Sequence, residues 1–377
     1  MSTRPSQIVQ LLQQRQADFQ AFDQRLFQGL QDYRRSMQQV AHMADRGVVA
    51  ESLANSRAGI FPWMLQWSSR EESLNWVRDC LTGVATFAVD GSQIYPSKDF
   101  SIPVALVQIG WFENRHEPQG NYEKDIRLDL LTPLQLRDSQ GDRSEEGGDR
   151  QVNMRRFEME TERLREYMEA HAGDPRCLVF LDGSLVATFA QSFEPEMRSF
   201  YSRCLRDLLR TSEDNRVPIV AYVDTSYAKD LTEQLQAWFA LPEVSSLHDA
   251  QILHPLMQWG DRTPLLRCQR KILQEFYGEQ HDRIGYLYLK THDGYPARLE
   301  LPLWIAENDR LEEVLKWVRG EVIIGGGYPY VIETADQVAV LQTDDRYTFY
   351  RLVQDWAEQE GISLRLSRKM VSKSRRR

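Results

Sequence analysis

The chain has 377 residues, a formal net charge of −9 and a hydrophobic content of 42%, enough for a substantial core in one large or two ordinary domains. Four scattered cysteines form no Cys-x-x-Cys pair, which excludes a zinc ribbon and a disulfide framework. No apolar signal region follows Met1, and no run of about 18 apolar residues occurs. We therefore expect a cytoplasmic protein with free thiols and no membrane association.

The charge is unevenly distributed along the chain. Residues 365–377, RLSRKMVSKSRRR, carry seven basic residues and no acid, which leaves −16 for the rest. Such a tail is typical of a phosphate-backbone contact or of a solvated chain end. The acidic body argues against a large basic groove, so a nucleic acid would have to bind at a local patch.

The first part of the chain has apolar residues at helical spacing. Residues 6–46 are predicted to form a long helix or a helical hairpin, and residues 60–80 a further helix. Short apolar runs at 84–89 and 101–112 predict two neighbouring strands. The polar, Gly-rich stretch 136–152 predicts a mobile loop.

The remaining sequence alternates between helical and strand patterns. We expect helices at 153–171, 193–212, 228–240, 247–277, 309–319, 333–342 and 346–360, strands at 177–181 and 217–223, and a β-hairpin formed by 284–291 and 296–304. The alternation predicts an α/β fold. We divide it into an N-terminal helical region (1–80), a main domain (81–360) and a basic C-terminal tail (361–377).

Three predicted strands each end in an aspartate, a small residue and a serine. The motifs are Asp90-Gly91-Ser92, Asp182-Gly183-Ser184 and Asp224-Thr225-Ser226. Because α/β sheets place functional groups at the carboxyl ends of their strands, these carboxylates are expected to converge. Clustered carboxylates repel one another unless a cation or proton lies between them, and hard divalent cations are the usual solution. The pattern predicts a metal-dependent enzyme that acts on phosphate esters.

Five segments, in this order, resemble the NurA nuclease family: FAVDGSQIYP (87–96), LVFLDGSL (178–185), QWGDRTPLL (258–266), ARLELP (297–302) and GGYPYVIETADQVAVL (326–341). The resemblance implies an RNase H-like central mixed sheet flanked by helices. It implies an enzyme that cleaves DNA with Mn²⁺ or Mg²⁺. It also implies a homodimer that works with a hexameric HerA-type ATPase in processing DNA ends for repair.

The same resemblance assigns the metal site. By motif, Asp90 and Asp182 are catalytic metal ligands, and a glutamate from the helix before Asp182 completes the set. That helix offers four candidates, of which we favour Glu160: Glu158, Glu160, Glu162 and Glu166. Many family members carry histidine where this chain has Asp336. An aspartate is expected to bind a hard cation there, but it cannot act as an imidazole acid or base.

Other polar residues near these motifs are candidates for contact with the DNA phosphates: Ser92, Ser184, Lys229, Arg262 and Arg298. Arg298 and Glu300 point to one face of a strand, so they either form an ion pair that supports the site or leave Arg298 to bind phosphate. Asp224 is either a further ligand or a turn former.

Two other functional classes stay open. A catalytically weakened scaffold that docks a DNA-translocating ATPase is favoured by Asp336 and the acidic body, and metal binding would argue against it. An aspartic protease is suggested by the repeated Asp-small-Ser pattern, although the helical content argues against it. The sequence specifies neither the polarity of digestion, nor a preference for single or double strands, nor exo- versus endonuclease action.

Overall fold

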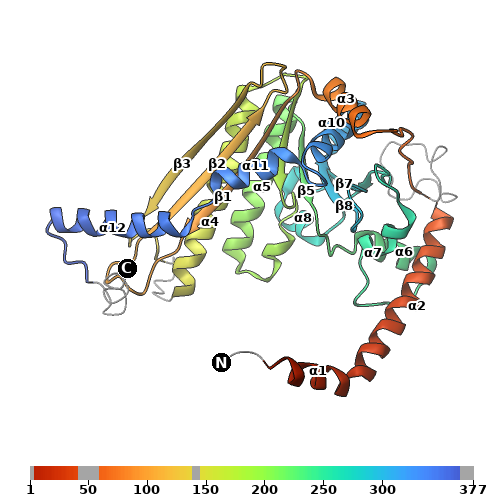
Figure 1. Cartoon of the computed structure of the whole chain (residues 1–377), viewed down its shortest axis with the longest axis horizontal. Helices are drawn as coiled ribbons and strands as arrows, with labels where there is room; N and C mark the ends of the chain where they lie inside the picture. The colour runs from red at the N-terminus through yellow and green to blue at the C-terminus, as the bar shows by residue number, and fades with distance from the viewer. Residues whose placement is uncertain (1–3, 41–58, 138–144, 366–377) are drawn as a thin grey trace. The chain divides into compact units, whose positions relative to one another are not determined.

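The computed structural model describes residues 4–40, 59–137 and 145–365, which fall into two compact units (Figure 1). Unit 1 comprises Met1–Gln66, Val223–Arg270 and Ile284–Glu300. Unit 2 comprises Trp67–Tyr222, Lys271–Arg283 and Leu301–Arg377. Each unit is assembled from three segments distant in sequence. The predicted division at residues 80 and 360 stays a prediction.

A mixed sheet forms the centre of unit 2. Its strands are β1 (Ala85–Ile94), β2 (Ala105–Asn114), β3 (Tyr122–Leu131), β4 (Cys177–Asp182) and β5 (Ile219–Val223). They lie in the order β3-β2-β1-β4-β5. The first three are antiparallel, whereas β4 runs parallel to β1 and β5 runs parallel to β4. This order and these directions are those of an RNase H-like sheet, so the predicted fold class is confirmed.

Helices cover the sheet of unit 2. Helix α4 (Glu145–Ala170) packs on β1 and β2 and against α5 (Pro195–Asn215), while α11 (Tyr330–Ala339) crosses β1 and β2 (Figure 1). Helix α3 (Arg70–Leu81) packs on α10 (Leu311–Ile324). The unit also contains α8 (Lys271–Phe276), α9 (Trp304–Glu307), α12 (Thr343–Gln359) and the 3₁₀ turns η2 (Thr188–Ser192) and η4 (Gly278–Gln280).

Local sequence signals account for several of these elements. The Ser69 side chain accepts a hydrogen bond from the Glu72 N–H and so caps α3. Helix α5 begins with Pro195, whose fixed φ suits the first turn, and ends at Arg216 in the left-handed region. Strand β4 is apolar and buried over Cys177–Leu181, as expected for a strand covered on both faces.

Three local predictions were wrong. Residues 145–152 belong to helix α4 rather than to the predicted loop, whose residues 138–144 lie outside the described part of the chain. Strand β1 continues through Asp90 to Ile94 instead of ending at Asp90, because β2 pairs with it along that whole length. The predicted helix 247–277 is interrupted by β6 (Leu266–Arg267).

Unit 1 combines helices with a small group of strands. Its helices are α1 (Pro5–Gln14), α2 (Gln16–Val40), α6 (Asp230–Phe239) and α7 (Asp249–Leu253), followed by the 3₁₀ turn η3 (His254–Leu256). Strand β7 (Ile284–Leu289) lies between β6 and β8 (Ala297–Pro302), so the predicted hairpin partners are neighbours. The buried Asp249 carboxylate accepts hydrogen bonds from the Leu231 and Thr232 N–H groups and so caps α6.

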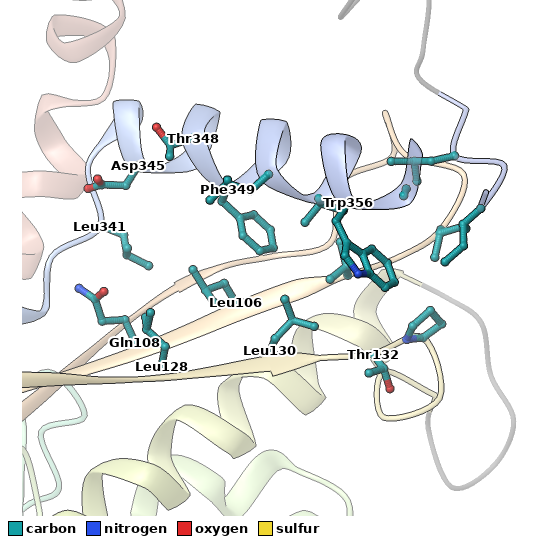
Figure 2. Close-up of a pocket in the computed structure, with 18 of the residues that line it drawn as sticks. Leu106, Gln108, Leu128, Leu130, Thr132, Leu341, Asp345, Thr348, Phe349 and Trp356 are labelled. Atoms are coloured by element: carbon teal, nitrogen blue, oxygen red, sulfur yellow. The ribbon is translucent and has the colours of Figure 1, made fainter. Parts of the chain in front are cut away.

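An apolar groove of about 950 Å³ lies between α12 and the strands β2 and β3 of unit 2 (Figure 2). Leu128 and Leu130 project from the sheet side, and Phe349 and Trp356 from the helix. Trp356 is 54% exposed and Leu128 is also 54% exposed. Helix α12 therefore covers this part of the sheet only in part, and the opening is lined by apolar side chains.

Within the described ranges, no helix has both the length and the apolar character that crossing a membrane requires.

A carboxylate cluster as candidate metal centre

Asp90 and Asp182 lie on neighbouring parallel strands. The pairing of β1 with β4 runs from Ala85 opposite Cys177 to Ala88 opposite Phe180. Continued by two residues, this register brings Asp182 beside Asp90. Asp182 is the last residue of β4, and Gly183 follows with a φ of 118°, a conformation that favours glycine. The parallel register thus brings the two aspartates together although 91 residues separate them in sequence.

Helix α11 brings Asp336 to the same place. Asp90 is opposite Gly110 in the β1–β2 ladder, so both residues face the same side of the sheet. An added Cβ on Gly110 would lie 2.6 Å from the backbone nitrogen of Ala339, which shows that α11 rests directly on this strand. The Asp336 carboxyl forms a hydrogen bond with the Asp90 carboxyl. Such a contact between two acids requires a shared proton.

Both ends of α11 are anchored. At its N-terminus, the Val331 N–H donates to the fully buried Glu321 carboxylate at 3.0 Å. At its C-terminus, the Gln108 amide donates to the Ala339 carbonyl at 2.9 Å. Ser92 Oγ accepts a hydrogen bond from the Leu341 N–H at 3.2 Å. Ser92, predicted to bind phosphate, therefore holds the segment that carries Asp336.

Glu160 approaches the aspartates from α4. An added Cβ on Gly91 would lie 2.3 Å from Glu160 Oε1, so the glutamate occupies the space that a side chain at position 91 would need. The Glu160 side chain is only 13% exposed, and its Oε1 lies 3.5 Å from Arg156 Nε. Since successive strand residues face opposite sides, Gly91 faces α4 while Asp90 faces α11.

The electrostatics confirm that these carboxylates interact. Burial raises the pKa of Asp90 to about 6, and Asp336 and Asp182 push it in the same direction. Burial also raises the pKa of Glu160 to about 8, with Asp90 and Asp182 adding to the shift and Arg156 opposing it. A raised pKa means that the ionised carboxylate is unfavourable in its surroundings, and either a bound proton or a bound cation compensates for that charge.

The comparison with protein-family models agrees with this geometry. The model described as NurA domain matches residues 84–341, which include all four carboxylates. The chain belongs to the NurA family. No curated protein matches it. Among solved structures, the catalytic domain of human endonuclease V is similar, with 15% identity, a TM-score of 0.34, and coverage of 74% of this chain and 88% of that one.

The donor set of this NurA domain suits a hard cation, although its side chains are not arranged around one. Among the described residues, no group of three His, Cys, Asp or Glu side chains is positioned to hold one ion. Instead each carboxylate has another partner: Glu160 is near Arg156, Asp90 is hydrogen-bonded to Asp336, and Asp182 accepts a hydrogen bond from Tyr328. All four supply the oxygen ligands that Mg²⁺ and Mn²⁺ prefer.

Two residues of the NurA site were not predicted from the sequence. Tyr328 Oη donates to Asp182 Oδ1 at 2.9 Å, and its ring meets Tyr222 edge-on at 5.2 Å between centroids. Arg156 lies over Gly91 beside Glu160. Tyr328 stands in the quoted Gly-Gly-Tyr-Pro-Tyr segment, which gave a signal for it. Arg156 is one of many arginines on a charged helix, so no sequence signal distinguishes it as a site residue.

The other glutamates of α4 have different partners. Glu158 lies 2.9 Å from Arg155, and Glu162 lies 3.6 Å from the same arginine. Glu166 pairs with Arg127 on β3 through two hydrogen bonds of 2.9 and 2.8 Å. The structure therefore brings Glu160, and not its three helical neighbours, to the aspartates. Ser184 closes a local turn, donating to the Val186 carbonyl and accepting from the Val186 N–H.

Five residues that the sequence predicts to bind DNA or support the site lie in unit 1: Asp224, Lys229, Arg262, Arg298 and Glu300. Arg298 is 1% exposed and pairs with Glu300 at 2.7 Å and Asp230 at 2.9 Å, which is the ion-pair alternative rather than a free phosphate ligand. Asp230 also binds Arg270, so these four charges form a buried network. Removing one partner of this network would leave an uncompensated charge in the core of unit 1 and would destabilise it.

The remaining candidates of unit 1 are also held by local contacts. Arg262 is 4% exposed and stacks on Phe61 with 4.1 Å to the ring centroid. Lys229 Nζ donates to the Ser245 carbonyl at 2.5 Å. Asp224 Oδ1 lies 3.3 Å from His292 Nε2. The phosphate-binding role of Arg262 and Lys229 stays a prediction, as do the two alternatives for Asp224, a further ligand or a turn former.

Proposed function

We propose that this chain is a metal-dependent DNA nuclease, with Mn²⁺ or Mg²⁺ held by Asp90, Asp182, Glu160 and Asp336. The observation that carries the proposal is the gathering of these four acids, two with raised pKa values, in a domain of the NurA family. Membership of this family supports a nuclease. The scaffold alternative is disfavoured because a protein without metal chemistry gains nothing from four mutually repelling carboxylates.

Each protein group has a distinct task in this proposal. The metal ions would activate water and stabilise the leaving oxygen of the phosphodiester. Asp90 and Asp182 hold the centre from the rigid sheet, while Glu160 and Asp336 close it from two helices. Tyr328 orients Asp182 through its hydroxyl. The anchored α11 keeps Asp336 in place.

The proposal is tested with purified protein and end-labelled single- and double-stranded DNA, in manganese, magnesium or chelator. Cleavage with a metal and none with chelator is the expected result. Activity on a protein substrate without added metal at acid pH would instead support the aspartic protease alternative. A folded protein that neither cuts DNA nor binds manganese would support the scaffold. The length and end group of the products would show exo- or endonuclease action.

Metal affinity is expected to rise with pH between about 6 and 8. Asp90 and Glu160 bind protons in this range in the metal-free protein, and a cation must displace them. Loss of one proton on binding gives about a tenfold gain in affinity per pH unit. Calorimetric titration with Mn²⁺ at pH 6, 7 and 8 measures this pH dependence of the affinity. The Glu160→Gln variant should show a weaker pH dependence than the wild type. An affinity independent of pH in the wild type would contradict the coupling.

The same shifts predict how the metal-free protein responds to pH. Both folded pKa values lie above the usual values for Asp and Glu, so the folded state binds these protons more tightly than the unfolded state. Their stabilising contribution is complete below about pH 4 and is lost as pH rises through 6 and 8.

For the assembly, we propose a homodimer that processes DNA ends in repair together with a HerA-type hexameric ATPase. The family membership supports both partners. Light scattering of the purified protein gives its mass, and a monomer at micromolar concentration would contradict the dimer. If the protein binds manganese without cutting, adding the ATPase shows whether the partner is required.

A further inference from the structure

Arg156 is the basic residue that the fold brings next to the carboxylate cluster. It lies on α4 one turn before Glu160, so both side chains point to the same face of the helix. An added Cβ on Gly91 would lie 2.7 Å from Arg156 Cγ and 3.0 Å from Cδ. The stem of the arginine therefore lies across β1 at the residue that follows Asp90.

Most N–H donors of the Arg156 guanidinium make no hydrogen bond to the described residues. Among the described residues, it makes one hydrogen bond, from Nη1 to the Gly91 carbonyl at 3.3 Å. Its Nε is buried and makes no hydrogen bond, and the oxygen of its ion-pair partner, Glu160 Oε1, lies 3.5 Å away. A guanidinium carries five N–H donors, and leaving them unpaired is costly when they are buried. The side chain as a whole is 33% exposed, so part of the group reaches solvent.

Other arginines around α4 are fully engaged. Arg155 pairs with Asp129 at 2.6 Å and with Glu158 at 2.9 Å. Arg127 forms two hydrogen bonds with Glu166, and Arg163 lies over the Phe87 and Trp111 rings. Arg156 differs because its nearest acid is a candidate metal ligand. A cation bound to Glu160 would draw on the negative charge of this carboxylate and so weaken its pairing with the guanidinium.

We propose that Arg156 forms a phosphate-oxygen subsite beside the metal centre and binds a non-bridging oxygen of the DNA backbone. The inference rests on the proposed nuclease function. Arginine is permanently charged and matches phosphate with two parallel hydrogen bonds. It also offsets the repulsion between four carboxylates and an anionic substrate. Three basic residues of unit 1 that the sequence offered for a phosphate contact have partners of their own: Arg298, Arg262 and Lys229.

A chemical double-mutant cycle tests the subsite. Arg156→Gln is compared with wild type in binding short oligonucleotides that carry one uncharged methylphosphonate, placed at each linkage in turn. Fluorescence anisotropy with Ca²⁺ in place of Mn²⁺ measures affinity while gels monitor cleavage. Arg155→Gln is the matched control, since Arg155 is the adjacent residue and its side chain is also 33% exposed. Thermal unfolding verifies that each variant is folded.

We expect Arg156→Gln to weaken binding of natural DNA by about tenfold to a hundredfold, which corresponds to the loss of a charge-assisted hydrogen bond. One methylphosphonate should weaken the wild type and Arg155→Gln similarly and leave Arg156→Gln unaffected. Arg156→Lys should recover only part of the affinity, because an ammonium lacks the paired donors.

Different failures have different signatures. If Arg156→Gln keeps the methylphosphonate sensitivity, or binds natural DNA as tightly as wild type, the subsite is overturned. If calorimetry shows altered Mn²⁺ affinity with unchanged DNA affinity, Arg156 only positions Glu160 and the subsite is again overturned. A wild-type protein that binds no DNA overturns the proposed nuclease function itself, and the subsite with it.

Discussion

Asp90→Asn is expected to abolish metal-dependent DNA cleavage while making the metal-free protein more stable. Asp90 stands at the centre of the cluster, in contact with Asp336 and in the field of Asp182 and Glu160. Losing one charged ligand removes about 4 kcal/mol or more of transition-state stabilisation, a rate loss of at least about 10³-fold. The amide can still share a hydrogen bond with Asp336, and it relieves the repulsion among the acids.

The gain in stability follows from the raised pKa. At pH 7.5 Asp90 is largely ionised against its environment, and a shift of two units corresponds to about 3 kcal/mol at most. A gain of 1–2 kcal/mol is therefore expected, which raises the midpoint of thermal unfolding in chelator by roughly 2–8 °C. Asp129→Asn is the control: it breaks an ion pair with Arg155 and should keep cleavage without gaining stability. A cleaving or destabilised Asp90→Asn protein would contradict the assignment.

The sequence was most informative where strand pattern and carboxylate coincide. Asp90 and Asp182 each follow an apolar run, and such runs become the buried centre of a sheet whatever the remaining chain does. Their mutual register could not be derived from the sequence, because β2, β3 and α4 lie between β1 and β4 along the chain and the pairing of these two strands is set by the tertiary structure. The structure brings both aspartates, Glu160 and Asp336 together, and their role as ligands stays a prediction.

Helical patterns were less informative about the site residues, because a charged helix offers several equivalent candidates. Glu158, Glu160 and Glu162 share one helix, and only packing on Gly91 selects Glu160. The same ambiguity hid Arg156. Strand β3 was missed although Ile126, Leu128 and Leu130 alternate with charged residues. That period of two is typical of a half-exposed strand, and the mixture of charges concealed it.

Predictions for the basic residues of unit 1 suffered from a different problem. Arg262 was selected for its charge, and for Arg298 the sequence left an ion pair with Glu300 and a phosphate contact both open. Arg298 is 1% exposed between Glu300 and Asp230, so its charge is already compensated in the core. Burial and pairing depend on the tertiary structure, whereas the chemistry of the side chain is apparent from the sequence.

Gly110→Ala is expected to disrupt the centre although residue 110 carries no functional group. Its Cβ would lie 2.6 Å from the Ala339 nitrogen and 2.8 Å from the Val338 carbonyl carbon. These are backbone atoms of the α11 segment and cannot rotate away. Either the helix lifts from the sheet or the strand shifts, at a cost of about 1–3 kcal/mol or more. Asp336 then leaves Asp90, and the Leu341 amide loses its hydrogen bond to Ser92.

We expect a lower midpoint of unfolding, weaker manganese binding and faster hydrogen exchange at the Leu341 amide. Gly148→Ala is the matched control, since Gly148 lies within α4 and its added Cβ would make only ordinary contacts, with Pro96 Cγ at 3.6 Å and the Leu136 carbonyl oxygen at 4.0 Å. It should leave metal affinity unchanged and raise stability by up to about 1 kcal/mol. In Gly91→Ala, by contrast, the Cβ meets the movable end of Glu160. That variant should lose metal affinity with little change in exchange at Leu341, because α11 remains seated on the sheet. Equal exchange rates in Gly110→Ala and wild type would show that the close approach of α11 does not hold Asp336 in place.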